Sequence, residues 1–224
     1  MDPQIRITGD GSTTLYAPDL DETYHSMNGA IKESQHVFME QGLEYYVGQA
    51  SKSPVTILEI GLGTGLNAWL SWHFADNRQV TLQYTSLDPF PLEPHILKEL
   101  NYSSIISLPG QPVSFDRIHE IAWEQAQPLS DYFTLYKVPQ RIQDFQETGT
   151  FDVVYFDAFA PNKQPEIWEK EVLEKVKSLM EPGSCLVTYC AQGQFKRNLQ
   201  SLGFEVSTLP GPPGKKEMTR AVLP

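Results

Sequence analysis

One segment limits what this chain can fold into more than any other: a short apolar run is followed directly by three alternating glycines. Residues 55–60 form the run, the glycines are Gly61, Gly63 and Gly65, and residues 66–72 have helical character. Glycines permit positive φ and let a ligand approach the backbone, and a helix N-terminus presents free N–H groups. We therefore expect a strand, a ligand-binding turn and a helix, with a tight turn that binds nothing as the alternative.

The same alternation of strand and helix recurs along the chain. Strand-like runs at residues 82–87 and 151–156 are followed by segments with helical character at residues 93–100 and 165–180. Repeated units of this kind indicate a parallel β-sheet with helices on both faces. A further helix is expected at residues 113–124.

The C-terminal part departs from this alternation. A strand at residues 184–189 and a helix at residues 192–202, closed by Gly203, precede two strands at residues 204–208 and 218–223. The link between the last two strands is rich in Pro and Gly and too short for a crossover helix, so they should be antiparallel. This layout predicts an α/β, Rossmann-like fold of the class I S-adenosylmethionine-dependent methyltransferases. The expected sheet is seven-stranded and mostly parallel, with an antiparallel C-terminal hairpin.

The part of the chain before the first core strand has its own pattern. Residues 1–24 are polar, contain short β-like pieces and predict a small hairpin or arm. Residues 26–49 predict one or two helices, which Gly42 would divide. We expect residues 1–50 to form an N-terminal arm and helices packed on a methyltransferase domain at residues 51–224, as one structural domain.

The glycine spacing and a second acidic residue indicate the cofactor. Leu66 stands where a dinucleotide fingerprint would place its third glycine, and alternating Gly-x-Gly-x-Gly is instead typical of S-adenosylmethionine sites. Asp88, at the end of the second strand, could accept both ribose hydroxyls, with a turn residue before Pro89 as the alternative. Residues 136–141, at the end of a third strand that precedes the one at residues 151–156, contain no acid, so Gln140 or Asp144 is left for the adenine amine. The candidate cofactor-binding residues are Glu59, Gly61, Gly63, Thr64, Gly65, Asn67 and Asp88.

Asp157 follows the fourth strand, at the sheet edge where the transferred methyl group lies in this fold. An amine attacks a methyl sulfonium only as the neutral base, and a carboxylate can accept its N–H and offset the charge developing on nitrogen. Asp157 is therefore the candidate catalytic residue, with a helix cap or turn residue as the alternative. Phe159, Pro161 and Trp168 would offer apolar surface for stacking a base, although each could equally belong to the core.

Charge limits the kind of nucleic-acid contact that is possible. The chain has 17 Lys and Arg against 28 Asp and Glu, a net charge of −11, which excludes the broadly basic surface of a non-specific coat protein. A local patch that contacts phosphates could still form around the final hairpin, with a solvated strand edge protected by lysines as the alternative. Its candidate members are Lys163, Lys196, Arg197, Lys215, Lys216 and Arg220.

Cysteine and histidine usage, together with the N-terminus, bears on the cellular setting. Cys185 and Cys190 lie five apart in an apolar segment and predict reduced, buried thiols. The five histidines show no paired metal-ligand spacing, so we expect no metal. No basic region followed by an apolar run opens the chain, and no segment approaches the roughly 20 apolar residues of a membrane helix. We expect a soluble, cytoplasmic protein.

Together these motifs resemble those of the MnmC/MnmD family of tRNA 5-aminomethyl-uridine methyltransferases, and the resemblance runs through most of the chain. Residues 24–43 are similar to the opening block of that family, and residues 59–67 are similar to its cofactor loop. The most specific match is Asp-Ala-Phe-Ala-Pro-Asn-Lys-Gln-Pro-Glu-Ile-Trp at residues 157–168. Residues 214–218 are similar to the C-terminal Gly-x-Lys-Arg-Glu-Met block.

The resemblance implies methyl transfer from S-adenosylmethionine to the exocyclic amine of 5-aminomethyl-(2-thio)uridine at the tRNA wobble position. It also implies a partner, the anticodon region of tRNA, and a role for Asp157 as hydrogen-bond acceptor for the substrate amine without a covalent intermediate. Fused members of the family carry a second, FAD-dependent oxidase domain. The chain ends directly after the terminal hairpin, so we expect the methyltransferase domain alone, without FAD.

Three other functions share the cofactor motifs. The chain could methylate a small-molecule amine or another RNA, which would change only the mouth of the site. It could be an aminopropyltransferase, which uses the same fold with a decarboxylated cofactor. It could also be a non-catalytic adaptor that holds S-adenosylmethionine or RNA, although an intact Asp157 beside an intact glycine turn argues against an adaptor.

Overall fold

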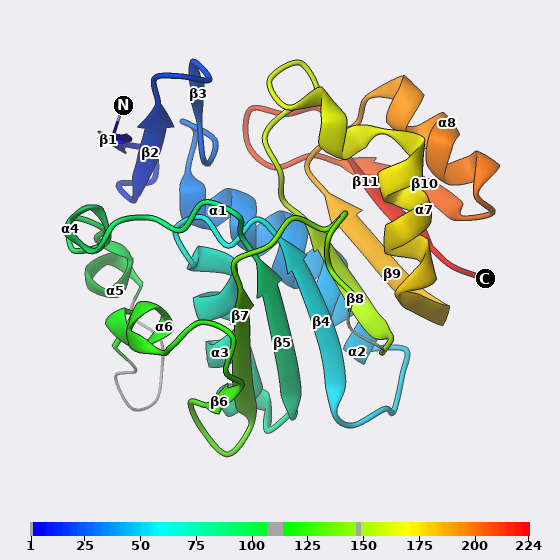
Figure 1. Cartoon of the computed structure of the whole chain (residues 1–224), viewed down its shortest axis with the longest axis horizontal. Helices are drawn as coiled ribbons and strands as arrows, with labels where there is room; N and C mark the ends of the chain where they lie inside the picture. The colour runs from blue at the N-terminus through cyan, green and yellow to red at the C-terminus, as the bar shows by residue number, and fades with distance from the viewer. Residues whose placement is uncertain (1, 107–113, 147–148) are drawn as a thin grey trace.

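The computed structural model describes residues 2–106, 114–146 and 149–224, and Figure 1 shows a central β-sheet with helices around it. Eight strands lie in the order β10-β11-β9-β8-β4-β5-β7-β6. Their bounds are β4 Val55–Ile60, β5 Leu82–Leu87, β6 Gln127–Pro128, β7 Phe133–Val138, β8 Phe151–Phe156, β9 Met180–Thr188, β10 Glu205–Pro210 and β11 Glu217–Val222. The two-residue strand β6 adds an eighth member to the seven that the pattern predicts.

The pairing of the strands confirms the predicted fold class. Strands β7, β5, β4, β8 and β9 are parallel neighbours, whereas β11 is antiparallel to both β9 and β10. Strand β4 lies in the centre, with Leu58 opposite Thr85 on one side and Val154 on the other. The carboxyl ends of β4, β5 and β8 therefore meet at one edge, where ligands bind in open α/β sheets.

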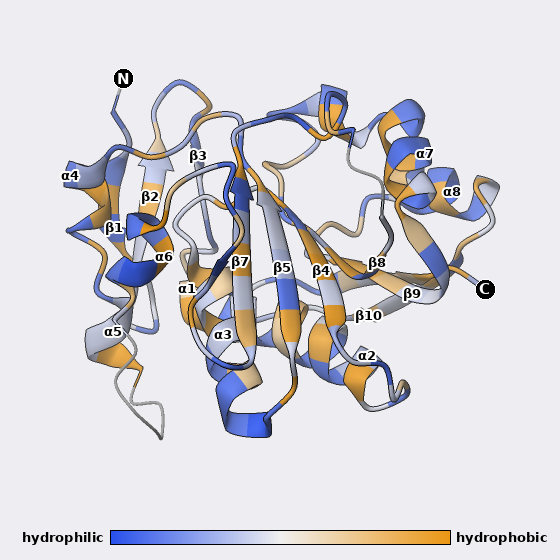
Figure 2. Cartoon of the chain, turned by 60° about the horizontal axis from the view of Figure 1, so that its bottom comes forward, coloured by the Kyte–Doolittle hydropathy of each residue, from blue (hydrophilic) through white to orange (hydrophobic). Residues whose placement is uncertain are grey.

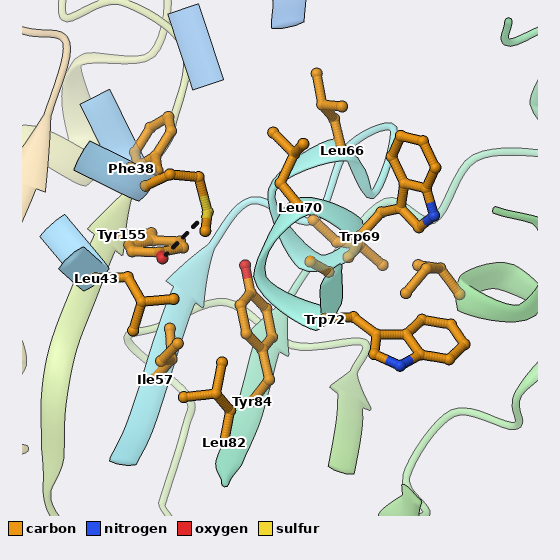
Figure 3. Close-up of a cluster of buried hydrophobic side chains, with 14 of the residues drawn as sticks. Phe38, Leu43, Ile57, Leu66, Trp69, Leu70, Trp72, Leu82, Tyr84 and Tyr155 are labelled. Carbon is orange, nitrogen blue, oxygen red and sulfur yellow. Dashed lines mark hydrogen bonds between the residues drawn. The ribbon is translucent and has the colours of Figure 1, made fainter. Parts of the chain in front are cut away.

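Alternate residues of the central strands supply two separate cores. Ile57, Tyr84 and Tyr155 point to the face covered by helix α3, Leu66–Arg78, and by the N-terminal helices (Figure 3). Leu58 and Val154 point to the face covered by α7, Lys170–Ser178, and α8, Gly193–Ser201. Hydrophobic and hydrophilic residues alternate along α7 (Figure 2), as expected of a helix with one buried side.

The N-terminal helical region is continuous rather than divided. It consists of α1, Ala30–Ser34, a π-helical segment η1, Gln35–Glu44, and α2, Tyr45–Val47. Gly42 lies inside η1, where a β-carbon would come within 2.8 Å of Val187 Cγ2 on the sheet. The expected division at Gly42 is wrong, because this glycine lets the helix approach the sheet closely instead of ending it.

A small sheet of three antiparallel strands precedes these helices. Its members are β1, Gln4–Ile7, β2, Thr13–Ala17, and β3, Glu22–Thr23. The pairing of β1 with β2 confirms the predicted N-terminal hairpin. The hairpin is tied to the main body because the side chain of Asn101 accepts the N–H of Thr13 at 2.8 Å.

Several connecting segments are shorter or more broken than the pattern suggests. Within residues 93–100, the helix is limited to α4, Pro94–Leu97. Within the helix expected at residues 113–124, the structure has α6, Asp116–Glu120; residue 113 of that expected helix lies outside the described residues. A short α5, Tyr102–Ile105, is additional.

The long helix expected at residues 165–180 is split. A 3₁₀-helix, Pro165–Trp168, ends at the extended residue Glu169, α7 follows, and Met180 already belongs to β9. Cys185 and Cys190 are free and buried, as predicted. Among the described residues, no helix is both long and apolar enough to cross a membrane.

Candidate active site

A cavity of about 770 Å³ opens at the carboxyl ends of β4, β5 and β8. This volume lies in the range of small-molecule and cofactor sites. Tyr24, Met27 and Glu33 from the N-terminal part of the chain line one wall, and Phe159 and Lys215 from its C-terminal half also line the cavity. Segments far apart in the sequence therefore build the cavity together.

The glycine turn forms the floor of this cavity. Gly61, Gly63 and Gly65 all have positive φ, and Gly63 donates its N–H to Asp88 Oδ2 at 2.8 Å. A β-carbon on Gly63 would lie 3.1 Å from the ring of Tyr24, so any larger residue at this position would press against that ring. Gly65 does not line the cavity; its N–H donates to the carbonyl of Leu62 at 2.8 Å and closes the turn before α3.

Asp88 faces the cavity, as the ribose prediction requires, and also shapes its own turn. Its two carboxylate oxygens accept the backbone N–H groups of Gly63 at 2.8 Å and Phe90 at 2.9 Å. Burial raises the pKa of this carboxyl group above its ordinary value, and the two backbone donors oppose that shift. Each carboxylate oxygen can accept more than one hydrogen bond, so both remain available to ribose hydroxyls.

The two candidates for the adenine amine are separated. Gln140 lines the cavity together with Arg141 and Ile142, whereas Asp144 is exposed and does not line it. Phe90 stands at the rim with 68% of its surface exposed, and the Arg141 guanidinium lies 6.0 Å from the centre of its ring. Sequence patterns did not predict this contact, because Phe90 and Arg141 lie in two loops that are far apart in the sequence and meet only in the folded protein.

Asp157 lies at the end of β8 and lines the cavity. Its Oδ2 accepts a hydrogen bond from Asn67 Nδ2 at 2.8 Å, so the first turn of α3 orients the carboxyl group. Burial and the negative charge of Glu33 raise the pKa of Asp157 to about 7, while Asn67 and Lys215 oppose the shift. A carboxyl group that titrates near neutrality can exchange a proton with an amine.

Two charged residues act on Asp157: Glu33, which had been assigned no role, and Lys215, which had been assigned to the phosphate-contacting patch. Glu33 is buried in the cavity wall, where its Oε1 accepts Lys215 Nζ at 2.7 Å and its Oε2 accepts the N–H of Ser26 at 2.6 Å. Lys215 Nζ also lies 3.6 Å from the centre of the Tyr189 ring. Glu33 lies within residues 24–43, which are similar to the opening block of the MnmC/MnmD family. That similarity was the only feature of the sequence that could have pointed to Glu33.

Six of the predicted site residues lie away from the cavity lining, Gly65 and Lys216 among them. Glu59 is fully buried behind the glycine turn. Trp168 is a core residue that packs between Phe156 and Phe195, and its indole N–H donates to the carbonyl of Phe159 at 2.8 Å. Pro161 and Lys163 lie outside the lining. Of the three predicted apolar residues, only Phe159 lines the cavity, with Tyr24 against it at a centroid distance of 5.0 Å.

The predicted basic patch is dispersed in the structure. Lys215 points into the cavity wall, whereas Lys216 is exposed, because neighbouring residues of the hairpin turn face different sides. The remaining cations of the group have separate partners. Arg220 lies 3.5 Å from the ring centre of Tyr45, Lys163 pairs with Asp21 at 3.6 Å, Lys196 pairs with Glu217 at 3.4 Å, and Arg197 donates to Gln194 at 2.8 Å.

Comparisons with known proteins agree with this geometry. A family model described as S-adenosyl-L-methionine-dependent methyltransferase matches residues 120–224. The chain is similar to the tRNA 5-methylaminomethyl-2-thiouridine biosynthesis bifunctional protein MnmC of Cupriavidus necator, with 31% identity over 92% of this chain and 32% of the relative. The MnmC protein of Leptospira interrogans is 28% identical over 95% of this chain and 34% of the relative. The chain thus spans about a third of the length of these relatives.

Comparison with solved structures also finds an MnmC protein and, more distantly, a shared fold. The crystal structure of MnmC2 from Aquifex aeolicus superposes with a TM-score of 0.77 and 25% identity, covering 99% of this chain and 70% of that one. The fold alone is shared with Streptomyces venezuelae DesVI, at a TM-score of 0.51 and 11% identity, over 87% of this chain and 92% of that one.

The sheet order, the glycine turn and the matching family model define an S-adenosyl-L-methionine-dependent methyltransferase. Within that class, the chain is similar over most of its length to MnmC proteins. The predicted resemblance and the predicted cofactor are thereby confirmed.

Proposed function

We propose that this enzyme methylates the exocyclic amine of 5-aminomethyl-(2-thio)uridine at the wobble position of tRNA and produces the 5-methylaminomethyl base. The observation that carries the proposal is the position of Asp157 in one cavity with the glycine turn and Asp88. The names of the MnmC relatives support the same substrate. The proposed partner is the anticodon region of tRNA, and the proposed location is the cytoplasm.

The residues of the cavity fit S-adenosylmethionine. Gly61 and Gly63 would hold its methionine part against the backbone, since a β-carbon on Gly63 would fill the space beneath Tyr24. Asp88 would accept the ribose hydroxyls, and Gln140 would contact the adenine amine. When bound, the cofactor would supply an electrophilic methyl group on a sulfonium, and the neutral thioether would be the leaving group.

Asp157 would prepare the substrate amine for this displacement. The amine must be neutral to attack, so an incoming ammonium group must first lose a proton. Asp157, with a pKa of about 7, can accept that proton or hold the amine through its N–H. Where Asp157 remains ionised and holds the amine through its N–H, its carboxylate would offset the positive charge that develops on nitrogen during transfer.

The wall around Asp157 suits a planar base that carries a positive group. Phe159 and Tyr24 supply aromatic surface, and RNA-binding proteins commonly stack unpaired bases on such rings. Glu33 adds a second negative group next to Asp157. A small-molecule amine would also be attracted by these charges, so a test with both kinds of substrate is needed to distinguish a small-molecule amine from the aminomethyl-uridine of tRNA.

We further propose that residues 1–50 act as an arm and helices attached to the domain formed by residues 51–224, within one structural unit. Supporting contacts join the two parts directly. Tyr46 donates its O–H to Asp152 at 2.8 Å, and Glu33 pairs with Lys215 at 2.7 Å.

The test is incubation of the purified protein with labelled S-adenosylmethionine and tRNA from cells that lack the methyl modification, followed by nucleoside analysis. The proposal expects label in 5-methylaminomethyl-uridine or its 2-thio form, and no label in tRNA whose wobble uridine lacks the aminomethyl group. Label confined to added small amines would contradict the tRNA substrate. Cofactor binding without any transfer would favour a non-catalytic adaptor.

A further inference from the structure

The glycine turn borders a second, smaller cavity of about 220 Å³. Leu62 and Gly63 of the turn line both this cavity and the larger one described above. Glycines have no side chain to pack, and a turn next to a cavity lacks part of the close packing that fixes most buried backbone. Hydrogen bonds must therefore contribute much of what holds this turn in its shape.

One of these hydrogen bonds comes from His119 in α6. Its Nε2 donates to the carbonyl oxygen of Thr64 at 2.9 Å, and a β-carbon on Gly65 would lie 3.0 Å from its Cε1. Among the described residues, no other donor reaches that carbonyl. Thr64 lines the larger cavity, whereas His119 lines only the smaller one. The imidazole therefore supports the turn from outside the candidate cofactor site.

The chemistry of this contact fixes the position of the imidazole proton. A carbonyl oxygen can only accept, so Nε2 must carry the hydrogen. Burial, the largest cause, and the charge of Lys137 lower the pKa of His119 to about 4, although the Thr64 carbonyl and Asp116 oppose this shift. At neutral pH the ring is therefore neutral and has a single N–H, which the turn uses.

A buried lysine fixes the segment that carries His119. Lys137 lies on β7 with 1% of its surface exposed, and its Nζ donates to the backbone carbonyl of His119 at 3.1 Å. The same Nζ lies 4.9 Å from the ring centre of Trp123, just beyond α6. Asp88 lines the same cavity, but within the described parts of the chain no carboxylate forms an ion pair with Lys137. The contacts of this ammonium group are therefore directed at the chain around His119.

We propose that His119 is a positioning residue for S-adenosylmethionine: its N–H holds the Thr64 carbonyl and keeps the glycine turn in the shape that receives the cofactor, while Lys137 keeps His119 in place. Tyr102 supports the same residue, since its hydroxyl donates to Thr64 Oγ1 at 3.2 Å. The connection between β5 and β7 thereby sets the affinity of a site that His119 and Lys137 do not line. The inference rests on the proposed role of the glycine turn and is independent of the methyl acceptor.

The experiment compares His119→Gln with His119→Phe in calorimetric titrations with S-adenosylmethionine. The amide of glutamine can donate from near the position of Nε2, so we expect a Kd within about threefold of the native value. Phenylalanine keeps a ring but leaves the Thr64 carbonyl without its donor, so we expect the Kd to rise by about tenfold. In methyl-transfer assays, His119→Phe should raise the KM for S-adenosylmethionine and leave kcat nearly unchanged at saturating cofactor. Equal Kd values for the two variants would overturn the proposal.

His73→Phe is the matched control. His73 is a buried histidine on α3, and its Nε2 has no hydrogen-bond partner among the described residues. Its replacement removes no contact with the turn, so the Kd should stay at the native value. A rise in Kd equal to that of His119→Phe would show that loss of any buried histidine weakens binding, and would contradict a specific role for His119.

Lys137→Met tests the second link. Methionine keeps an unbranched chain but has no donor, so we expect the Kd to rise by about threefold in the native background and to rise no further when added to His119→Phe. Additive effects would show that Lys137 does not act through His119.

Nitrogen NMR of the native protein gives a readout that does not depend on a disruptive variant. At neutral pH, the histidine signal that disappears in His119→Gln should be that of a neutral ring protonated at Nε2. A ring that is charged or protonated at Nδ1 would refute the proposal even if His119→Phe does not fold. Gly61→Ala tests the turn directly: if it loses cofactor affinity while His119→Phe retains it, the turn binds the cofactor and only the role of His119 fails.

Discussion

A β-carbon on Gly61 would lie 2.5 Å from the carbonyl oxygen of Asp157. The ends of β4 and β8 therefore converge more closely than any other residue type at position 61 would allow. Next to this contact, Asp157 donates its N–H to the carbonyl of Ile60 at 3.1 Å. The glycine turn and the candidate catalytic carboxylate are thus parts of one backbone junction, and a change in one should displace the other.

Gly61→Ala tests this junction. The new methyl group meets backbone rather than a flexible side chain, and Gly61 has a φ of 97°, so we expect a loss of about 1–3 kcal/mol of stability and no measurable cofactor binding. Gly149→Ala is the matched control, because nothing lies within 4 Å of its β-carbon position. Thermal denaturation and calorimetry provide both readouts. Native cofactor affinity in Gly61→Ala would show that the turn is not a binding element.

Asp157→Asn separates chemistry from binding. The amide keeps the size of the side chain but cannot accept a proton from the amine, so we expect kcat to fall by about two orders of magnitude with cofactor affinity nearly unchanged. Asp144→Asn, in an exposed loop outside the cavity, should leave both quantities at native values. Single-turnover methyl transfer measures the effect, and near-native turnover in Asp157→Asn would remove this residue from the mechanism.

The pH dependence of kcat/KM follows from the same carboxyl group. Burial raises the pKa of Asp157 to about 7, and its ionised form is the active one, so activity should increase as pH rises through about 7. An ordinary aspartate, titrating at 3.8, would give no such dependence in this range. A flat profile between pH 6 and 8 would contradict a role for Asp157 as proton acceptor.

Lys215 and Lys216 should behave differently although they are adjacent. Lys215 pairs with Glu33 at 2.7 Å and lowers the pKa of Asp157, so Lys215→Ala should move the acidic limb of the pH profile to higher pH. Lys216 is exposed, so Lys216→Ala should leave this limb in place and, if it meets a phosphate, reduce the salt dependence of tRNA binding by about one unit of slope. Equal effects of the two substitutions on the pH profile would contradict the structure.

Asp152 links the N-terminal helices to the sheet. Its carboxylate accepts hydrogen bonds at 2.8 Å from Tyr46, from Lys52, and from both the N–H and the hydroxyl of Thr56. Burial acts to raise its pKa, but these donors outweigh burial and lower it below 3.8. The stabilisation is therefore present above pH 3.8 and is lost as pH falls through the lower folded-state pKa.

Asp152→Asn should reduce the free energy of unfolding at neutral pH by about 2 kcal/mol, because an amide accepts fewer of these hydrogen bonds. Urea denaturation at neutral and acidic pH measures the change. The difference between native protein and variant should shrink toward the acid end of the range. A difference that is independent of pH would show that the charge of Asp152 contributes nothing.

Local sequence patterns predicted those parts of the fold that are determined by residues adjacent in the sequence. The strand Val55–Ile60 and the turn at Gly61 were recognisable because an apolar run and alternating glycines are both contiguous signals. The antiparallel C-terminal hairpin followed from the length and composition of its connection. These features require no knowledge of what lies opposite them in space.

Sequence patterns could not decide the residues whose role is set by distant neighbours. Trp168 was given base stacking and core packing as equal alternatives; Phe156 and Phe195 enclose it, and nothing near it in sequence reveals this. The pairing of Lys215 with Glu33 joins positions 182 residues apart. The π-helical segment escaped prediction because an apolar spacing does not distinguish hydrogen-bond patterns within a helix.

That long-range ion pair has a consequence for how the enzyme is made. The ribosome makes Glu33 182 residues before Lys215, so this ion pair of the cavity wall forms only after Lys215 has emerged. A cofactor bound in the completed cavity would stabilise the fold in which helix α1 and the C-terminal hairpin meet, because both line that cavity. The cell's supply of S-adenosylmethionine should consequently govern how many newly made chains resist proteolysis, and pulse-chase labelling under methionine limitation would reveal that dependence.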